Sequence, residues 1–251
     1  MHTPATDTHD GSASQTVRAQ LRLREMILDG ELPAGERVSE PVVAEITGIS
    51  RTPIRAALVR LQEEGLLEPI PSGGFRVRAF SVDEIRDAIE IRGTLEGLAA
   101  RLAAERGVPD GELRAMSDCV ARIDDVLDAG DLDEARFERY VDANARFHEL
   151  LAGACRSEVV QRQVARGNAL PFASPNGFIR VQAAAPDALR TLLIANAQHR
   201  AVIEAIAGRE GARAEALMRE HARIAHRNLQ ASLANPRVMD LIPGGRLIRQ
   251  G

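Results

Sequence analysis

Three histidines in the second half of the chain are spaced so that their imidazoles could meet. His199 and His221 are equidistant from residue 210, which lies in a glycine-bounded turn between two helical patterns. Residues equidistant from the turn of an antiparallel helix pair lie at the same level, so these two side chains should be neighbours. His148 belongs to a third helical pattern, and Asn144 precedes it by one turn on the same face. Three imidazoles and one amide oxygen would suit a divalent metal site with open positions, for Zn²⁺ or Ni²⁺.

Arg92 is a second residue with chemical potential, because it lies among apolar residues. It falls on a stripe with Ile85 and Ile89 in a predicted helix over 82–106, and Glu96 follows one turn later. A buried guanidinium needs a partner. Arg92 could form a structural ion pair with Glu96, or it could reach a cavity in a helical bundle and bind a carboxylate. The pattern alone leaves both interpretations open.

A separate set of polar residues suits contact with DNA. Residues 50–60 contain three arginines and no acid, and their helical periodicity puts Arg55 and Thr52 opposite an apolar face. Arg51 lies at the margin of that face, near the start of the helix. Arginine reads guanine edges in a bidentate manner, and the hydroxyls of Ser50 and Thr52 could hold phosphate. A solvated arginine face on an ordinary amphipathic helix is the alternative.

The elements around these residues indicate a mostly α protein with two domains. Residues 1–13 are expected to be a disordered tail. Three short helices and a β-hairpin around Ser72-Gly73-Gly74 make a winged helix-turn-helix domain over 14–80. Helical periodicity over 81–234, with a less regular stretch at 168–185, predicts an all-α antiparallel bundle. Residues 235–251, rich in proline and glycine, are expected to be an extended tail.

Composition excludes some classes of protein and sharpens the nucleic-acid question. The 251 residues carry a net charge of −4, and all 32 basic residues are arginines. No apolar run is long enough to cross a membrane, and the polar N-terminus is unlike a signal peptide. Two cysteines make no disulfide framework, which favours the cytoplasm. Residues 14–80 are neutral, with nine arginines and nine acids, so positive charge is concentrated on the expected recognition helix and hairpin rather than spread over the domain.

The segment GISRTPIRAALVRLQEEGLLEPIPSGGFRVR resembles the DNA-binding signature of the GntR family of bacterial transcription regulators. The resemblance covers residues 15–79. It implies contacts to double-stranded operator DNA by Ser50, Arg51, Thr52 and Arg55, and by the hairpin tip around Gly73. Many members carry a further arginine where this chain has Pro41, and Arg37 is a candidate substitute.

The helical domain resembles the FCD effector domain of the FadR branch of this family. The resemblance assigns Asn144, His148, His199 and His221 to a metal site, with asparagine where aspartate is commoner. An uncharged first ligand implies a more cationic site and weaker metal binding. The IRxxLE motif favours a cavity role for Arg92, so a metal and an arginine would bind a small carboxylate effector. Two segments, IRDAIEIRGTLEGLAARLAAERG and NALPFA, are similar to vanillate-responsive repressors, which implies an aromatic acid, with Phe172 and Phe178 lining its pocket.

Three functions are weighed on these residues. The first is a ligand-controlled repressor that binds a palindromic operator as a homodimer and is released by the carboxylate. The second is a regulator that senses the metal itself. Such a sensor does not need an arginine that binds a carboxylate, so Arg92 distinguishes it from the first. The third is a metal-dependent hydrolase, which lacks a placed general base because Glu149 points away from the neighbouring His148 on the helix.

Overall fold

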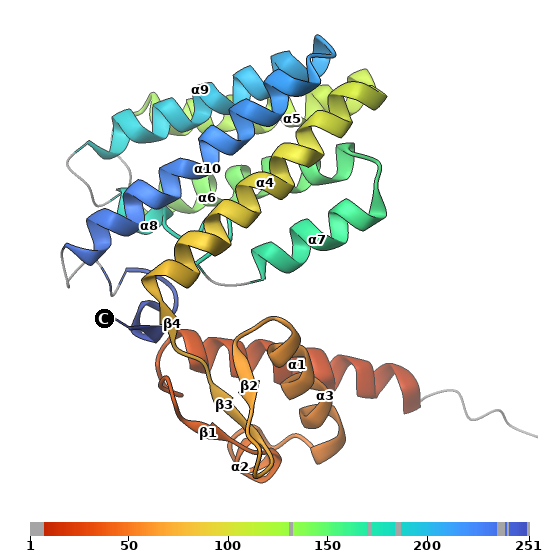
Figure 1. Cartoon of the computed structure of the whole chain (residues 1–251), viewed down its shortest axis with the longest axis vertical. Helices are drawn as coiled ribbons and strands as arrows, with labels where there is room; N and C mark the ends of the chain where they lie inside the picture. Colours follow the sequence, from red (N-terminus) through yellow and green to blue (C-terminus); the bar gives the residue numbers. More distant parts are fainter. Residues whose placement is uncertain are drawn as a thin grey trace, which may run out of the picture. The chain divides into compact units, whose positions relative to one another are not determined.

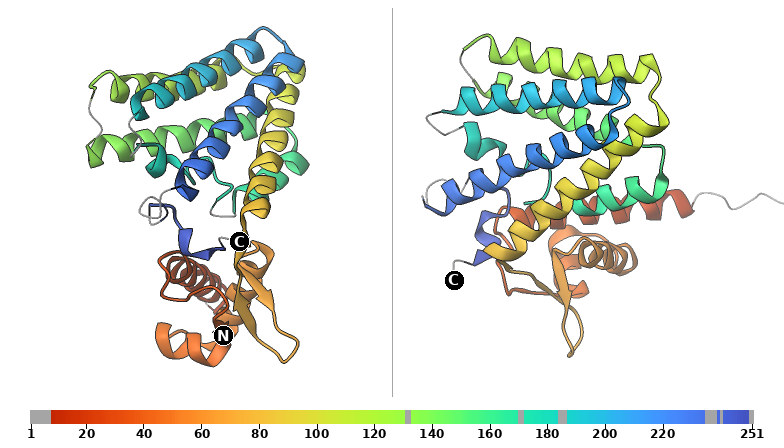
Figure 2. Two further views of the ribbon diagram at one scale, coloured as in Figure 1. Left: turned by 60° about the vertical axis from the view of Figure 1, so that its left-hand side comes forward. Right: turned by 45° about the horizontal axis from the view of Figure 1, so that its top comes forward.

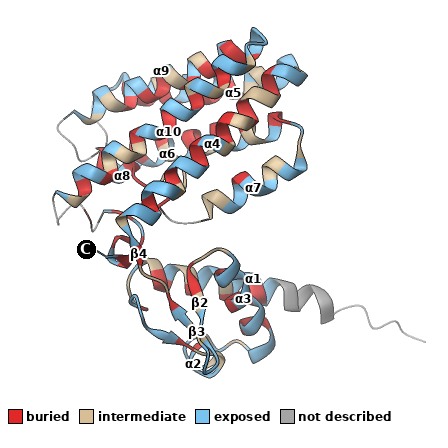
Figure 3. Cartoon of the chain, in the orientation of Figure 1, coloured by how far each residue is buried: buried red, intermediate tan, exposed pale blue. Residues whose placement is uncertain are grey.

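The structure is a computed structural model that describes residues 8–130, 133–169, 172–183, 187–234, 239 and 241–249, with side chains from residue 14 onward. The chain divides into two compact units, one of residues 1–82 with 243–251 and one of residues 83–242. Each unit has its own buried core (Figure 3). None of the described helices combines the length and the apolar composition that a membrane span requires.

The first unit is a winged helix-turn-helix with three helices and a small antiparallel sheet of order β1-β3-β2 (Figure 1). In chain order its main elements are α1 (Thr8–Leu28), β1 (Arg37–Val38), α2 (Glu40–Thr47), α3 (Arg51–Glu63), β2 (Leu67–Pro69) and β3 (Phe75–Val77). The expected hairpin is β2–β3, which pairs Leu67 with Val77 and Pro69 with Phe75. The sequence analysis missed β1, because a two-residue strand shows no alternation and gains its place only by pairing with β3.

The turn between α2 and α3 explains how the recognition helix is set. Gly48 ends α2 in the left-handed conformation, at φ 67°, and its N–H bonds to the Ala44 carbonyl. The expected apolar face of α3 is buried, with Ile54, Leu58 and Leu61 fully inside. Ser50 precedes the helix in extended backbone, although its hydroxyl makes no capping hydrogen bond.

The expected tails are partly wrong. Residues 1–7 of the predicted disordered tail lie outside the described residues, and 8–13 are the first residues of α1. The described part of the predicted extended C-terminus contains the 3₁₀ turn η1 (Gly245–Leu247) and strand β5 (Ile248–Arg249). Strand β5 pairs in parallel with β4 (Phe80–Ser81), and Leu247 is buried. These apolar residues therefore complete the first unit, instead of forming a separate tail.

The second unit is an antiparallel bundle, shown from two further sides in Figure 2. Its helices are α4 (Val82–Arg106), α5 (Asp110–Leu127), α6 (Glu134–Ala154), α7 (Glu158–Asn168), α8 (Ile179–Ala183), α9 (Ala188–Ala207) and α10 (Gly211–Leu233). Helix α8 interrupts the stretch predicted to be irregular, whose residues 170–171 and 184–185 lie outside the described part. Five helices share one core, which includes Ala100, Met116, Phe147, Leu151, Val202 and Met218. This core places α6, α9 and α10, the helices of the three histidines.

Helices α4 and α10 approach each other closely because two glycines lie between them. A Cβ atom added at Gly93 would stand 2.7 Å from the Ala222 Cβ, and one at Gly97 would stand 2.9 Å from the Arg219 Cγ. No real side chain tolerates 2.7 Å between two carbons without movement. The two glycines therefore set the distance between Arg92 on α4 and His221 on α10.

Replacing Gly93 with alanine should test this contact. Alanine favours a helix over glycine by about 1 kcal/mol, yet we expect Gly93→Ala to destabilise the protein by about 1–3 kcal/mol, the usual cost of overpacking. Urea unfolding measures the change. The double variant Gly93→Ala with Ala222→Gly restores the space and should recover most of the loss, and a single variant as stable as wild type would contradict the account.

Candidate metal centre and nucleic-acid interface

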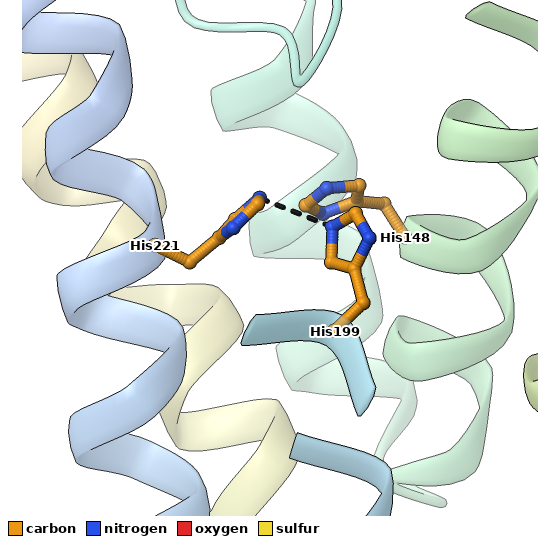
Figure 4. Close-up of side chains that lie close together, drawn as sticks. All are labelled: His148, His199 and His221. Carbon is orange, nitrogen blue, oxygen red and sulfur yellow. Dashed lines mark hydrogen bonds between the residues drawn. The ribbon is translucent and has the colours of Figure 1, made fainter. Parts of the chain in front are cut away.

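The bundle brings His148, His199 and His221 together from three helices (Figure 4). Each side chain is almost fully buried, with 3%, 0% and 8% of its surface exposed. The Nε2 atoms of His199 and His221 lie 3.2 Å apart, as their equal distances from the turn predict. One ring nitrogen from each of the three lies within 4.8 Å of the others. The three imidazoles thus form one buried cluster.

The geometry of this cluster fits a metal ion. Nitrogen ligands about 2.0–2.1 Å from one Zn²⁺ lie about 2.8–3.4 Å from each other, at angles between about 90° and the tetrahedral angle. The 3.2 Å between the two Nε2 atoms is in that range. The Nε2 atom of His148 is buried and has no hydrogen-bond partner. An unpartnered buried lone pair is costly unless a metal, water or ligand satisfies it.

Carboxylate and amide oxygens orient two of the rings. Glu96 Oε1 lies 2.9 Å from His148 Nδ1, and Gln198 Oε1 lies 3.1 Å from His221 Nδ1. When each Nδ1–H donates to these oxygens, both Nε2 atoms carry the lone pair that ligates a metal. The sequence analysis gave Glu96 only an ion-pair role and missed Gln198. The signal in the sequence for Gln198 was its position next to His199. Because α9 packs along α10, residues adjacent to His199 lie near the part of α10 that holds His221.

Burial favours the neutral form of two of these imidazoles, those of His199 and His221. The pKa of His199 lies well below its ordinary value, because burial penalises the cation and His148 adds repulsion. The pKa of His221 is lowered by burial and by the neighbouring His199, His148 and Arg92. Burial alone would raise the pKa of Glu96, but the charges of His148 and Arg92 outweigh it, so that pKa is lowered. Neutral His199 and His221 and an ionised Glu96 are protonation states that suit metal binding.

Arg92 forms the predicted ion pair and also lines a cavity, so the structure leaves both of its sequence-based interpretations open. Its Nη1 lies 3.9 Å from Glu96 Oε2, with both side chains buried, so the ion pair is present. Arg92 also lines a cavity of about 30 Å³, together with His221, Asn144 and Phe178. Its Nε is buried without a hydrogen-bond partner. The guanidinium therefore keeps a donor for a ligand in that cavity.

Asn144 lies at the same cavity but is engaged elsewhere. Its Nδ2 donates to Asn176 Oδ1 at 2.9 Å, and Asn176 Nδ2 donates to the Val141 carbonyl at 3.3 Å. Because a carbonyl can only accept, the second bond fixes the orientation of both amides. Only Oδ1 of Asn144 is left as a ligand atom. Phe172 is buried, but only Phe178 lines the cavity.

The predicted DNA-binding residues share the exposed side of the helix-turn-helix and its wing. Ser50, Arg51, Thr52 and Arg55 are all exposed at the N-terminal end of α3. Arg55 Nε lies 3.7 Å from Glu40 Oε1, a loose pair with 77% of the Arg55 side chain exposed. Gly73 forms the wing tip at φ 91°, where its carbonyl accepts a bond from Arg37. The hairpin thus brings Arg37, the proposed substitute for the arginine missing at Pro41, to the wing.

Comparisons with known proteins match both units. Residues 87–223 match the FCD domain, and residues 15–77 match the bacterial regulatory proteins of the gntR family. A transcriptional regulator of the helix-turn-helix type from the TAR-I ttuE–ttuC' intergenic region of Agrobacterium vitis is 32% identical over 149 residues, which cover 59% of this chain and 84% of the relative. The repressor GlaR of Escherichia coli is 25% identical over 205 residues, which cover 79% and 88%. The solved structure of E. coli McbR/YncC, 19% identical, covers 87% of this chain and 98% of its own with a TM-score of 0.62, which supports the fold.

The lowered histidine pKa values predict how stability depends on pH. Below about pH 6.5, the ordinary histidine pKa, His199 and His221 become protonated in the unfolded chain but stay neutral in the folded protein. Their contribution is therefore complete above that pH and is lost as pH falls toward the folded pKa values. At pH 5.5, metal-free protein should lose up to about 1.4 kcal/mol of unfolding free energy per histidine. Urea unfolding at pH 7.5 and 5.5 measures the loss, which should be smaller in His221→Gln, and an equal loss in both proteins would contradict the assignment.

Proposed function

The chain belongs to the gntR family of bacterial regulatory proteins, and on that premise we propose that it is a repressor released from its operator by a small carboxylate. It is a transcription regulator with a helix-turn-helix domain and an FCD effector-binding domain, and it is not an enzyme. The hydrolase alternative is therefore wrong. Glu149, the base considered for it from the sequence, is exposed and pairs with Arg146 at 3.1 Å.

The DNA-binding role falls to the exposed end of α3 and to the wing. Arg51 and Arg55 would reach base edges in the major groove, while the hydroxyls of Ser50 and Thr52 would hold phosphate. The main-chain atoms of Gly73, at the tip of the wing, would contact the DNA backbone next to the major groove. A palindromic operator bound by a homodimer follows from the geometry of such motifs, whose half-sites lie about one DNA turn apart. The DNA partner also implies the cytoplasm.

The observation that carries the effector proposal is one buried site holding three imidazoles and the guanidinium of Arg92. His148, His199 and His221 would hold Zn²⁺ or Ni²⁺, with Asn144 Oδ1 as a fourth ligand, and the metal would supply a positive charge for an anionic oxygen. Arg92 would hold the second oxygen of the carboxylate. An aromatic acid such as vanillate is proposed as the effector on sequence similarity, with Phe178 at the cavity.

Repression, rather than activation, is favoured by the name of the relative GlaR, a repressor aligned over most of both chains. For a carboxylate to release DNA, it must bind the conformation with low operator affinity more tightly than the one with high affinity. A regulator that senses the metal alone remains the second candidate, supported by the unpartnered Nε2 of His148.

Replacing Arg55 with alanine should separate DNA binding from folding. We expect Arg55→Ala to weaken operator binding at least tenfold, because one good guanine contact contributes about 1–3 kcal/mol. The melting temperature should not change, since the side chain is mostly exposed. Gel shift against the chain's own promoter DNA measures affinity, with Arg114→Ala in the second unit as the matched control. Wild-type affinity of Arg55→Ala would refute the assignment of the recognition helix.

A thermal-shift screen of small carboxylates, aromatic acids first, tests the effector proposal. With Zn²⁺ present, at least one acid should raise the melting temperature by several degrees, and Arg92→Gln should abolish that rise. Gel shifts with operator DNA, with and without Zn²⁺ and with and without acid, then distinguish the carboxylate-responsive repressor from the metal sensor. Release of DNA by Zn²⁺ alone, with no further effect of acids, would favour the metal sensor. If no acid raises the melting temperature, the proposal of a carboxylate effector is wrong.

A further inference from the structure

The histidine cavity is too small for the effector that the proposed function gives it. Its volume of about 30 Å³ is close to the share of one water molecule in the liquid. Part of its wall comes from the segment over residues 172–178, through Pro175 and Phe178. A carboxylic acid can therefore enter only if part of this wall moves, and the direction of entry depends on what lies behind it.

A much larger groove, lined by α6, α7 and the same segment, shares Pro175 with this cavity. Its volume is about 410 Å³, within the range of small-molecule sites. Pro175 lines both the cavity and the groove. Asn144 faces the cavity, and its hydrogen-bond partner Asn176 faces the groove. The divider between the two spaces is thus Pro175 with one pair of asparagines.

Buried polar atoms without partners gather near this divider. His148, whose Nε2 is unpartnered, lines the groove and is 97% buried. Asn168 also lines the groove and has an unpartnered Oδ1. Polar atoms in this state are costly unless a bound group satisfies them. They mark the line along which a polar ligand would extend from the groove to the cavity.

We propose that the α6–α7 groove is a ligand site that holds the body of the effector, and that Asn176 is the gate through which its acid group reaches Arg92 and the histidines. Opening needs only the loss of the Asn144–Asn176 bond and a shift of Pro175. An aspartate at position 144 could not donate to Asn176 Oδ1, so asparagine at this position serves the gate. The proposal rests on the proposed function, because the acid group binds at the same Arg92 and histidine cluster.

The lining of the groove also selects among acids. Its walls carry small apolar residues and uncharged amides, and its one charged side chain, apart from the imidazole of His148, is Glu149. No arginine is among its lining residues, and Arg146, which pairs with Glu149 at 3.1 Å, lies outside that lining, so a second carboxylate on the ligand would meet Glu149 with no lining cation to offset it. The geometry therefore favours a monocarboxylic acid with an uncharged, hydrogen-bonding body over a dicarboxylic acid.

Filling the groove tests its role with Zn²⁺-loaded, full-length protein. Ala165→Phe and the smaller Ala152→Leu both add volume inside the groove, while Ala121→Phe on exposed α5 is the matched control. With vanillate and benzoate as probes, both filling variants should weaken binding at least tenfold in calorimetry, and the control should not. Operator affinity without acid should stay at the wild-type level in all three, which shows that they are folded.

Two further measurements use the same proteins. Benzoate should bind wild type at least tenfold more tightly than isophthalate, its dicarboxylate counterpart. Asn176→Ala should raise the association rate of the acid severalfold in stopped-flow measurements, because the gate bond is lost. Three results would each contradict the groove site while leaving the proposed function intact. They are wild-type affinity for the acid in both filling variants, tighter binding of isophthalate than of benzoate, and an unchanged association rate in Asn176→Ala. If wild type binds no acid of the screen, the proposed function fails and the groove site with it.

Discussion

Placing three imidazoles side by side in a nearly dry interior is the constraint on which the second unit depends. Burial and mutual repulsion lower the pKa values of His199 and His221, which favours their neutral form. Glu96 and Gln198 supply the oxygens that set ring orientation. The surrounding core holds the backbones of three different helices so that the nitrogens converge. A cluster of this kind is expensive to bury without an occupant, and this cost is the physical reason to regard it as a site.

The position of Arg92 depends on the same packing. Gly93 and Gly97 bring α4 against α10, so the guanidinium beside them reaches the cavity lined by His221. The chain enters α4 directly from β4, and β5, which follows α10 along the chain, pairs with β4. The cavity is lined from α4, α6, α8, α9 and α10, and two of these helices, α4 and α10, are thus connected in sequence to paired strands of the first unit. Changes in the packing of α4 and α10 have these two covalent routes toward the first unit.

Much of this arrangement was predictable, because helices give a regular relation between spacing and position. The turn at residue 210 was enough to pair His199 with His221, and helix α4 covers the residues expected. Contacts across the bundle were not predictable. The bond from Glu96 to His148 joins residues 52 positions apart, and nothing in either local pattern specifies it. The same holds for the C-terminal strand β5, where two residues pair only because β4 offers an edge, and for the Asn144–Asn176 bond.

The central claim is that the buried imidazoles form a metal site, and X-ray absorption on the Zn²⁺-loaded protein examines it most directly. After dialysis against metal-free buffer, the account predicts one retained Zn²⁺ per chain, with three imidazole nitrogens at about 2.0–2.1 Å. In His148→Ala, the number of imidazole nitrogens around Zn²⁺ should fall to two, or the protein should no longer retain Zn²⁺. Loss of all Zn²⁺ from wild type on dialysis, or a retained ion with fewer than three imidazoles, would contradict it.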